Sequence, residues 1–98
     1  PNTNALIANE IVSALDDPSA TVRAAACRAL SLVNDARDET IKKLAASVDD
    51  QCYGVSLEAV HSLCKLSPEA RMWPSVQDWL QENKGYWWVN ELLEEKDG

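Results

Sequence analysis

The residues best suited to chemistry in this chain are His61 and Cys64, which stand three positions apart in an apolar stretch. Residues at this spacing share a face of a helix, so the two side chains could form a thiol–imidazole pair. Nucleophilic catalysis also needs a third group that orients the base and a pocket that holds the substrate. The sequence shows no such constellation, and we therefore expect that the protein is not an enzyme.

Metal ligands are equally sparse. His61 is the only histidine, and the cysteines Cys27, Cys52 and Cys64 show no Cys-x-x-Cys spacing. Zinc sites use several such ligands at short spacings, so we expect no metal and no cofactor. Two of the cysteines lie in apolar helical stretches, where a free thiol acts as a small hydrophobe. The odd total of three cysteines also argues against a disulfide framework and favours a reducing compartment, so we expect the protein in the cytoplasm.

The chain is acidic, with 16 Asp and Glu against 9 Lys and Arg and a net charge of −7. An acidic field repels phosphate groups, so we expect neither nucleic-acid nor membrane binding. A basic protein partner fits this charge, although solubility alone also explains it. Four acids near the C-terminus could form a cation site, but a solvated helix face is the simpler interpretation: Glu82, Glu91, Glu94 and Glu95.

An internal repeat is the clearest pattern in the sequence. Residues 15–33 return in altered form at 48–66, an offset of 33 positions. The matched pairs include Leu15/Val48, Asp16/Asp49, Asp17/Asp50, Val22/Val55, Ala26/Ala59 and Leu30/Leu63. A period of 20–50 residues is typical of solenoids, in which similar units stack on one another.

The apolar spacing predicts helices and no strands. We expect helices at about 4–15, 18–33, 38–48, 51–66, 74–83 and 86–96, with a single turn at 68–72. Asp17 is predicted to cap the second helix with Pro18 as its first residue, and Asp50 repeats the cap. Ser67 with Pro68 predicts another start.

Each helix should bury one face. The predicted inner residues of the first two helices are Ile7, Ile11 and Leu15, then Val22, Ala25, Ala26, Ala29, Leu30 and Val33. Those of the last two are Val76, Trp79 and Leu80, then Tyr86, Val89, Leu92 and Leu93. The aligned Leu30 and Leu63 should lie between helix pairs.

The run Leu15-Asp16-Asp17-Pro18, followed by Val22-Arg23 and the alanines before Leu30, resembles a HEAT repeat, most closely the short phycobilisome-lyase type. The resemblance implies an all-α fold: an α-solenoid of three antiparallel helix pairs, the third degenerate. It implies one domain over 1–98, with repeats at about 4–33, 38–66 and 68–96. It also implies that an Asp in the turn of one repeat contacts an Arg in a helix of a neighbouring repeat. Asp17, Asp50 and Arg23 match these positions. In the second repeat the position of the Arg is occupied by Ser56.

In such a solenoid the second helices line a concave face used for protein recognition. Outward residues there are expected to include Ala24, Arg28 and Ser31, then Leu57, His61, Cys64 and Lys65. We interpret Leu57 as an apolar anchor with Arg28 and His61 as polar contacts, although an ordinary helix surface would look similar.

Aromatic residues gather near the C-terminus, with Trp73, Trp79, Tyr86, Trp87 and Trp88 within 16 positions. Adjacent helical residues point about 100° apart, so Trp87 and Trp88 cannot both face inward. They either cap the end of the solenoid or contact another chain.

Together these features predict a non-catalytic protein-interaction module or scaffold. Its partner is expected to be another protein, and a second copy of the chain is one possibility. Two alternatives stay open: an enzyme-associated subunit, such as a lyase-type chaperone for a bilin or another cofactor, and a fragment of a longer HEAT solenoid.

Overall fold

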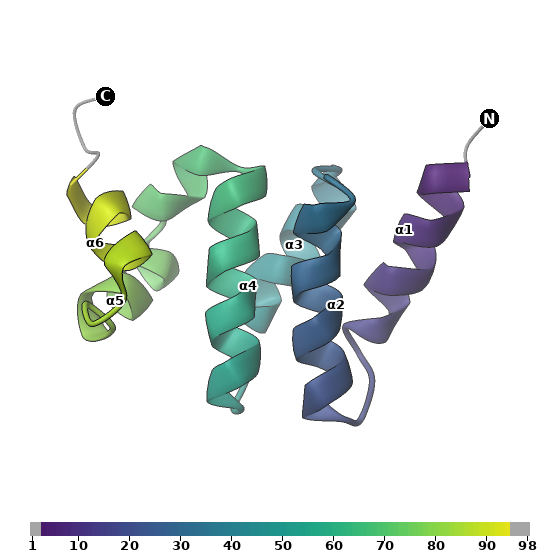
Figure 1. Cartoon of the computed structure of the whole chain (residues 1–98), viewed down its shortest axis with the longest axis horizontal. Helices are drawn as coiled ribbons and strands as arrows, with labels where there is room; N and C mark the ends of the chain where they lie inside the picture. Colours follow the sequence, from purple (N-terminus) through teal and green to yellow (C-terminus); the bar gives the residue numbers. More distant parts are fainter. Residues whose placement is uncertain (1–2, 95–98) are drawn as a thin grey trace.

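The computed structural model describes residues 3–94 of the 98-residue chain. Figure 1 shows its helices following one another along the long axis, from α1 at one end to α5 and α6 at the other. They are α1 (Thr3–Ala14), α2 (Ala20–Leu32), α3 (Asp38–Ser47), α4 (Tyr53–Leu66), the 3-10 helix η1 (Pro68–Met72), α5 (Pro74–Glu82) and α6 (Trp87–Glu94). No strand occurs between residues 3 and 94, which confirms the all-α prediction. The predicted extension of the last helix to residue 96 lies outside the described residues.

The helices stack as an α-solenoid. Helices α2 and α4 lie side by side and run in the same direction (Figure 1), and they share the most extensive packing of any two elements. Helix α3 packs behind α4, and α1 packs against α2. Helices α5 and α6 have 9 and 8 residues, against 14 in α4, so the third pair is the shortest, as the weak third repeat predicted.

Helices α2 and α4 begin two residues later than predicted. Asp17 Oδ1 accepts a hydrogen bond from the Ser19 backbone N–H at 2.8 Å, and Asp50 Oδ1 accepts one from Cys52 at 2.9 Å. These contacts close a local turn ahead of each helix, so Ser19 and Cys52 hold the N-cap positions. The cap assignment of Asp17 and Asp50, and of Pro18 as the first helical residue, was therefore wrong. Each aspartate does accept a backbone N–H, but from the N-cap residue and not from within the helix.

Proline marks both starts in the third pair. Pro68 opens η1 after Ser67, and Pro74 opens α5 after Trp73. Proline suits a first helical position because the N–H that it lacks would have no partner there. Both starts agree with the prediction, although the Ser67 side chain makes no cap hydrogen bond.

A continuous core runs from Leu15 to Val89. Its largest fully buried side chains are Leu30, Leu44, Leu63, Leu80, Val55, Val60, Val76, Val89, Thr40 and Cys27. Leu30 and Leu63 are both 0% exposed, which confirms their predicted equivalence. Free Cys27 and Cys64 are buried as small hydrophobes.

Several predicted inner residues at the α1 edge are exposed instead. Val22 and Val33 are 39% and 40% exposed, Ile7 is 47% exposed, and Ala25 is also exposed. Val22 and Ala25 line a hollow between α1 and α2, so α1 covers that face of α2 incompletely. Ile7 belongs to α1, which lies at one end of the stack (Figure 1), and Val33 is the C-cap of α2. At the other end Tyr86 is exposed, because Trp88 takes the inward position that Tyr86 was predicted to hold.

Candidate functional site

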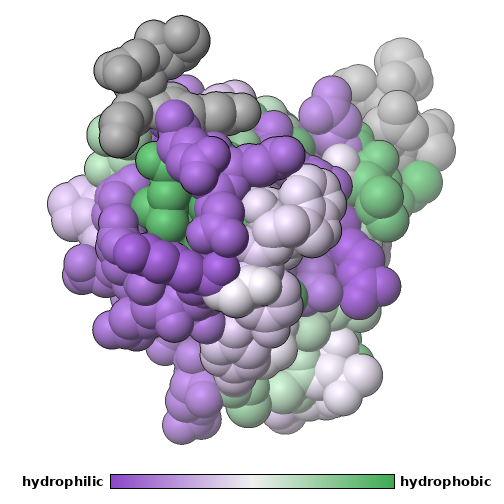
Figure 2. All heavy atoms as spheres, turned by 60° about the vertical axis from the view of Figure 1, so that its left-hand side comes forward, coloured by the Kyte–Doolittle hydropathy of each residue, from purple (hydrophilic) through white to green (hydrophobic). Residues whose placement is uncertain are grey.

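The candidate site is the face built from the second helices of the three pairs, which we call the α2–α4–α6 face. It carries the five residues predicted to bind protein: Arg28, Leu57, His61, Trp87 and Trp88. Figure 2 shows its α5 and α6 end, where a pale band of intermediate hydropathy runs between strongly hydrophilic regions.

A chain of stacked rings joins α4, α5 and α6. The Trp79 ring lies 6.0 Å from Tyr53 and 5.9 Å from Trp88, and Trp88 lies 4.3 Å from the His61 ring. Tyr86 lies 5.9 Å from Trp88 on a tilted plane. Each pair of Tyr and Trp rings contributes about 0.5–1.5 kcal/mol beyond the area that it buries. The stack therefore fixes the short third pair against α4.

Hydrogen bonds hold these rings in place. Trp79 Nε1 donates to Ser56 Oγ at 3.2 Å, and the Tyr53 hydroxyl donates to Asn83 Oδ1 at 2.6 Å. Asn83 Nδ2 donates to the Trp79 carbonyl at 2.7 Å. Partial desolvation of its hydroxyl, together with the Tyr86 hydroxyl, raises the pKa of Tyr53 to about 12. No pattern in the sequence indicated Tyr53 or Asn83, and only the 33-residue offset from Arg23 marked Ser56.

The two adjacent tryptophans separate, as helix geometry requires. Trp88 is half-buried within the stack, whereas Trp87 is 72% exposed. Beside them is a hollow of about 190 Å³. Its lining consists of His61, Cys64, Lys65, Trp87, Trp88, Glu91 and Leu92. Trp87 is thus a large ring held in solvent at the rim of a hollow.

Arg28 and Leu57 lie further along the same face. Arg28 is exposed, and its Nη2 lies 3.3 Å from Glu58 Oε2, an ion pair between α2 and α4 that the sequence did not indicate. Leu57 is half-buried and packs against the core, so its exposed surface is small. The face therefore runs from a charged pair at α2 and α4 to an aromatic rim at α6.

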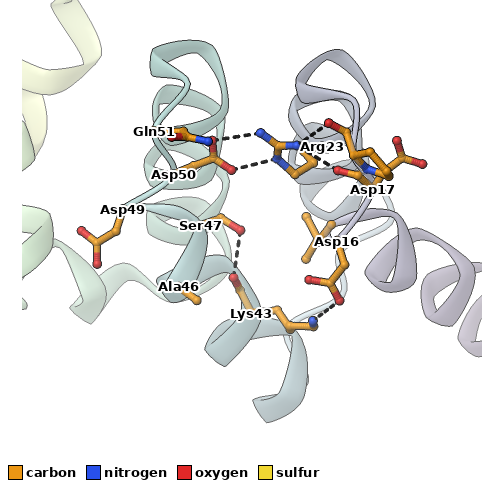
Figure 3. Close-up of a pocket in the computed structure, with 11 residues that line it drawn as sticks. Asp16, Asp17, Arg23, Lys43, Ala46, Ser47, Asp49, Asp50 and Gln51 are labelled. Carbon is orange, nitrogen blue, oxygen red and sulfur yellow. Dashed lines mark hydrogen bonds and ion pairs between the residues drawn. The ribbon is translucent and has the colours of Figure 1, made fainter.

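Figure 3 shows the turn edge, where Arg23 crosses from α2 to the turn before α4. Arg23 Nε lies 2.9 Å from Asp50 Oδ2, and Nη1 donates to the carbonyls of Asp17 and Pro18 at 2.8 and 3.0 Å. The hydrogen bond from Arg23 lowers the pKa of Asp50 and raises that of Arg23. Arg23 lies beside a hollow of about 640 Å³, but its hydrogen bonds to protein indicate a structural role.

A family profile for HEAT repeats matches residues 8–93 of the chain. The chain belongs to the HEAT-repeat family. The Arg23–Asp50 pair is the inter-repeat contact that the resemblance implied, and it joins the first HEAT repeat to the second. The narrower phycobilisome-lyase type stays a prediction. Among curated proteins and solved structures, no significant match to the chain was found.

The His61–Cys64 pair in this HEAT-repeat chain does not form a nucleophile. Cys64 is buried, contrary to its predicted outward position, on a helix against which η1 packs. Burial raises the pKa of the Cys64 thiol to about 11, which disfavours the reactive thiolate. Burial also lowers the pKa of His61, whose ring stacks on Trp88.

The acidic residues of the last helices do not converge. Glu82, Glu91 and Glu94 are exposed, and Glu95 lies outside the described residues. In the described part of the chain, no group of three or more His, Cys, Asp or Glu side chains could hold a metal ion. Among the helices described, none has the length and apolar character needed to cross a membrane.

Proposed function

We propose that this HEAT-repeat protein is a non-catalytic protein-binding module whose partner docks on the α2–α4–α6 face. HEAT repeats generally serve as scaffolds for protein interaction, and the family match covers residues 8–93. Trp87 and Trp88 have different roles: Trp87 contacts the partner, and Trp88 holds α6 in place from within the aromatic stack.

The exposure of Trp87 carries this proposal. Its ring is 72% exposed, although tryptophan is among the residues most enriched at interaction hot spots. The neighbouring Trp88 is held in the stack, so its own side chain would lose little freedom on binding. Arg28, Leu57 and His61 would extend the contact along α2 and α4.

The shape of the aromatic end favours this function over a lyase-type chaperone for a cofactor. Small-molecule sites usually enclose about 300–1,000 Å³. Here Trp79 and Trp88 stack on each other, and the hollow beside Trp87 holds only about 190 Å³. A larger hollow of about 350 Å³ reaches Tyr53 and Trp79, but most of its lining is polar and comes from the turn before α4 and the end of α5. A shallow rim of this kind suits a protein surface.

Charge indicates the kind of partner. The net charge is −7, and Glu91 lines the hollow beside Trp87. A basic surface would be attracted to this field. The free thiols of Cys27, Cys52 and Cys64 are compatible with a reducing compartment, and we keep the cytoplasm as the proposed location.

A cross-linking pull-down from the source cell tests the proposal, with wild type, Trp87→Ala and Met72→Ala as baits. Met72 on η1 is 56% exposed and serves as the matched control, since it also removes a large exposed apolar side chain. We expect Trp87→Ala to lose the captured partner and Met72→Ala to retain it. Circular dichroism confirms that each bait is folded. Undiminished capture by folded Trp87→Ala would rule out this docking mode.

A further inference from the structure

A second apolar surface lies at the opposite end of the molecule, between α1 and α2. A hollow of about 300 Å³ there is lined by Glu10, Ile11, Ala14, Val22, Ala25, Ala26 and Ala29. Val22 is 39% exposed within it, and Leu6 and Ile7 on α1 are 68% and 47% exposed. We call this surface the α1–α2 groove. It shares no residue with the hollow beside Trp87.

The internal repeat indicates what covers such a groove. Residues 33 positions after Ile11 and Val22 are Leu44 and Val55, which are 0% and 1% exposed. Val55 is buried because α2 packs over that face of the second pair. The α1–α2 groove therefore corresponds to the surface of the second repeat, formed by α3 and α4, on which α2 lies.

At the polar end of the groove, Asp17 occupies the repeat position that Asp50 holds in the second repeat. Asp50 accepts hydrogen bonds from the Cys52 N–H and from Arg23 of the covering helix. The carboxylate of its counterpart Asp17 accepts the Ser19 N–H, yet no cation pairs with that carboxylate among residues 5–94. In Figure 3 the Asp17 carboxylate points away from Arg23. Asp17 is thus placed to receive a cation from outside the chain.

We propose that the α1–α2 groove docks an amphipathic α-helix of a partner protein that carries the contact residues of α2. In α2 these are Arg23, which reaches Asp50, and Cys27 and Leu30, which are both 0% exposed. The partner helix would present a basic residue, a small residue four positions later and a large aliphatic residue seven positions later. A second copy of this chain cannot supply that face, because its own Cys27 and Leu30 are already buried.

A peptide copy of α2 tests the proposal directly. The probe is a fluorescein-labelled peptide of residues 17–34 with Cys27→Ala, titrated with the full chain and followed by anisotropy. We expect saturable binding, weakened about tenfold or more by Val22→Glu in the protein, because a charge would then be buried in an apolar groove. Trp87→Ala should leave peptide binding unchanged, so this result and the partner pull-down report on different surfaces. Absence of saturable binding, or binding unaffected by Val22→Glu, overturns the proposal.

The charge match is tested by a double-mutant cycle between Asp17→Asn in the protein and Arg23→Gln in the peptide. We expect each change to weaken binding, and the two together to weaken it no more than the stronger one alone. If the peptide instead displaced the chain's own α2, Asp50→Asn would weaken binding and Asp17→Asn would not, which overturns the proposal. Light scattering tests whether a second copy of the chain occupies the groove. If the wild-type chain is a dimer and Val22→Glu is a monomer, the occupant is a second copy, and the proposal of a partner helix is refuted.

Discussion

Arg23 Nε lies 2.9 Å from Asp50 Oδ2, so a side chain of α2 holds the turn that precedes α4. Ser56, 33 positions after Arg23, joins α4 to α5 in the next repeat, because its Oγ accepts a hydrogen bond from Trp79 Nε1 at 3.2 Å. One repeat position thus joins the first pair to the second by an ion pair and the second to the third by an indole hydrogen bond. The third pair departs from the repeat pattern and is secured by aromatic contacts instead.

Replacing Asp50 by Ala should destabilise the fold more than replacing Asp17 by Ala. Asp50 accepts hydrogen bonds from Arg23 and from the Cys52 N–H, whereas Asp17 accepts only the Ser19 N–H among the described contacts of its carboxylate. Urea unfolding should show a loss of about 1–3 kcal/mol for Asp50→Ala and about 0.5–1.5 kcal/mol for Asp17→Ala. Equal losses would mean that the Arg23 contact adds nothing to stability.

Ser56→Ala should cost about 1–3 kcal/mol, because it leaves the buried Trp79 N–H without an acceptor. Ser75 is exposed on α5 and provides the matched control, since Ser75→Ala removes a hydroxyl that water can solvate. Urea melts followed by tryptophan fluorescence report the difference. If the two variants unfold alike, the indole hydrogen bond is not what secures the third pair.

Leu30→Ala and Leu63→Ala should each destabilise by about 2–5 kcal/mol, because both side chains are 0% exposed and each change leaves a cavity. Leu32 belongs to the same helix as Leu30 but is 76% exposed, so Leu32→Ala should change stability by less than about 0.5 kcal/mol. Denaturant titrations compare the three. Losses under about 0.5 kcal/mol at both Leu30 and Leu63 would contradict the repeat alignment.

Asp35 should make stability fall in acid. Arg37 and the buried Thr40 donate hydrogen bonds to its carboxylate, and the bonds from Arg37 contribute most to lowering its pKa from 3.8 to about 2. A carboxyl whose pKa is lower in the folded chain stabilises it above pH 3.8, and that contribution is lost as the pH falls toward 2. Asp35→Asn should thus be less stable than wild type at pH 6, with the gap narrowing toward pH 2. A gap that stays constant in urea melts across this range would exclude the linkage.

The repeat unit was predictable because its signal lies within the local sequence. The offset that pairs Leu30 with Leu63 identifies two residues that are both fully buried. Pro68 and Pro74 fix helix starts by their own covalent geometry, and the structure places both starts there. Such features do not depend on which neighbour covers a helix.

Features that depend on a neighbour were not predictable. Val22 and Val55 share one repeat position, yet Val22 is 39% exposed because no helix like α2 covers it. The start of α2 at Ala20 depends on a turn in which Asp17 and Ser19 compete for the same role. On the α2–α4–α6 face, periodicity separated Trp87 from Trp88 but could not say which one faces inward. The stack on His61 and Trp79 decides that.

Trp88→Ala should lower the stability of the fold, whereas Trp87→Ala should weaken partner binding. Trp88 stacks on His61 at 4.3 Å and on Trp79 at 5.9 Å, so its removal should cost about 2–4 kcal/mol and loosen α6. Trp87 is 72% exposed, and its removal should change stability by less than about 0.5 kcal/mol.

Partner binding by folded variants should depend on Trp87 instead. Trp87→Ala should weaken partner binding more than Arg28→Ala does, because Arg28 is an exposed rim charge already paired with Glu58. The double variant Trp87→Ala with Trp88→Ala should lose both stability and binding. Urea melts and circular dichroism measure the first quantity, and light scattering with a pull-down measures the second. A stable Trp88→Ala together with a destabilised Trp87→Ala would exchange the assigned roles of the two rings.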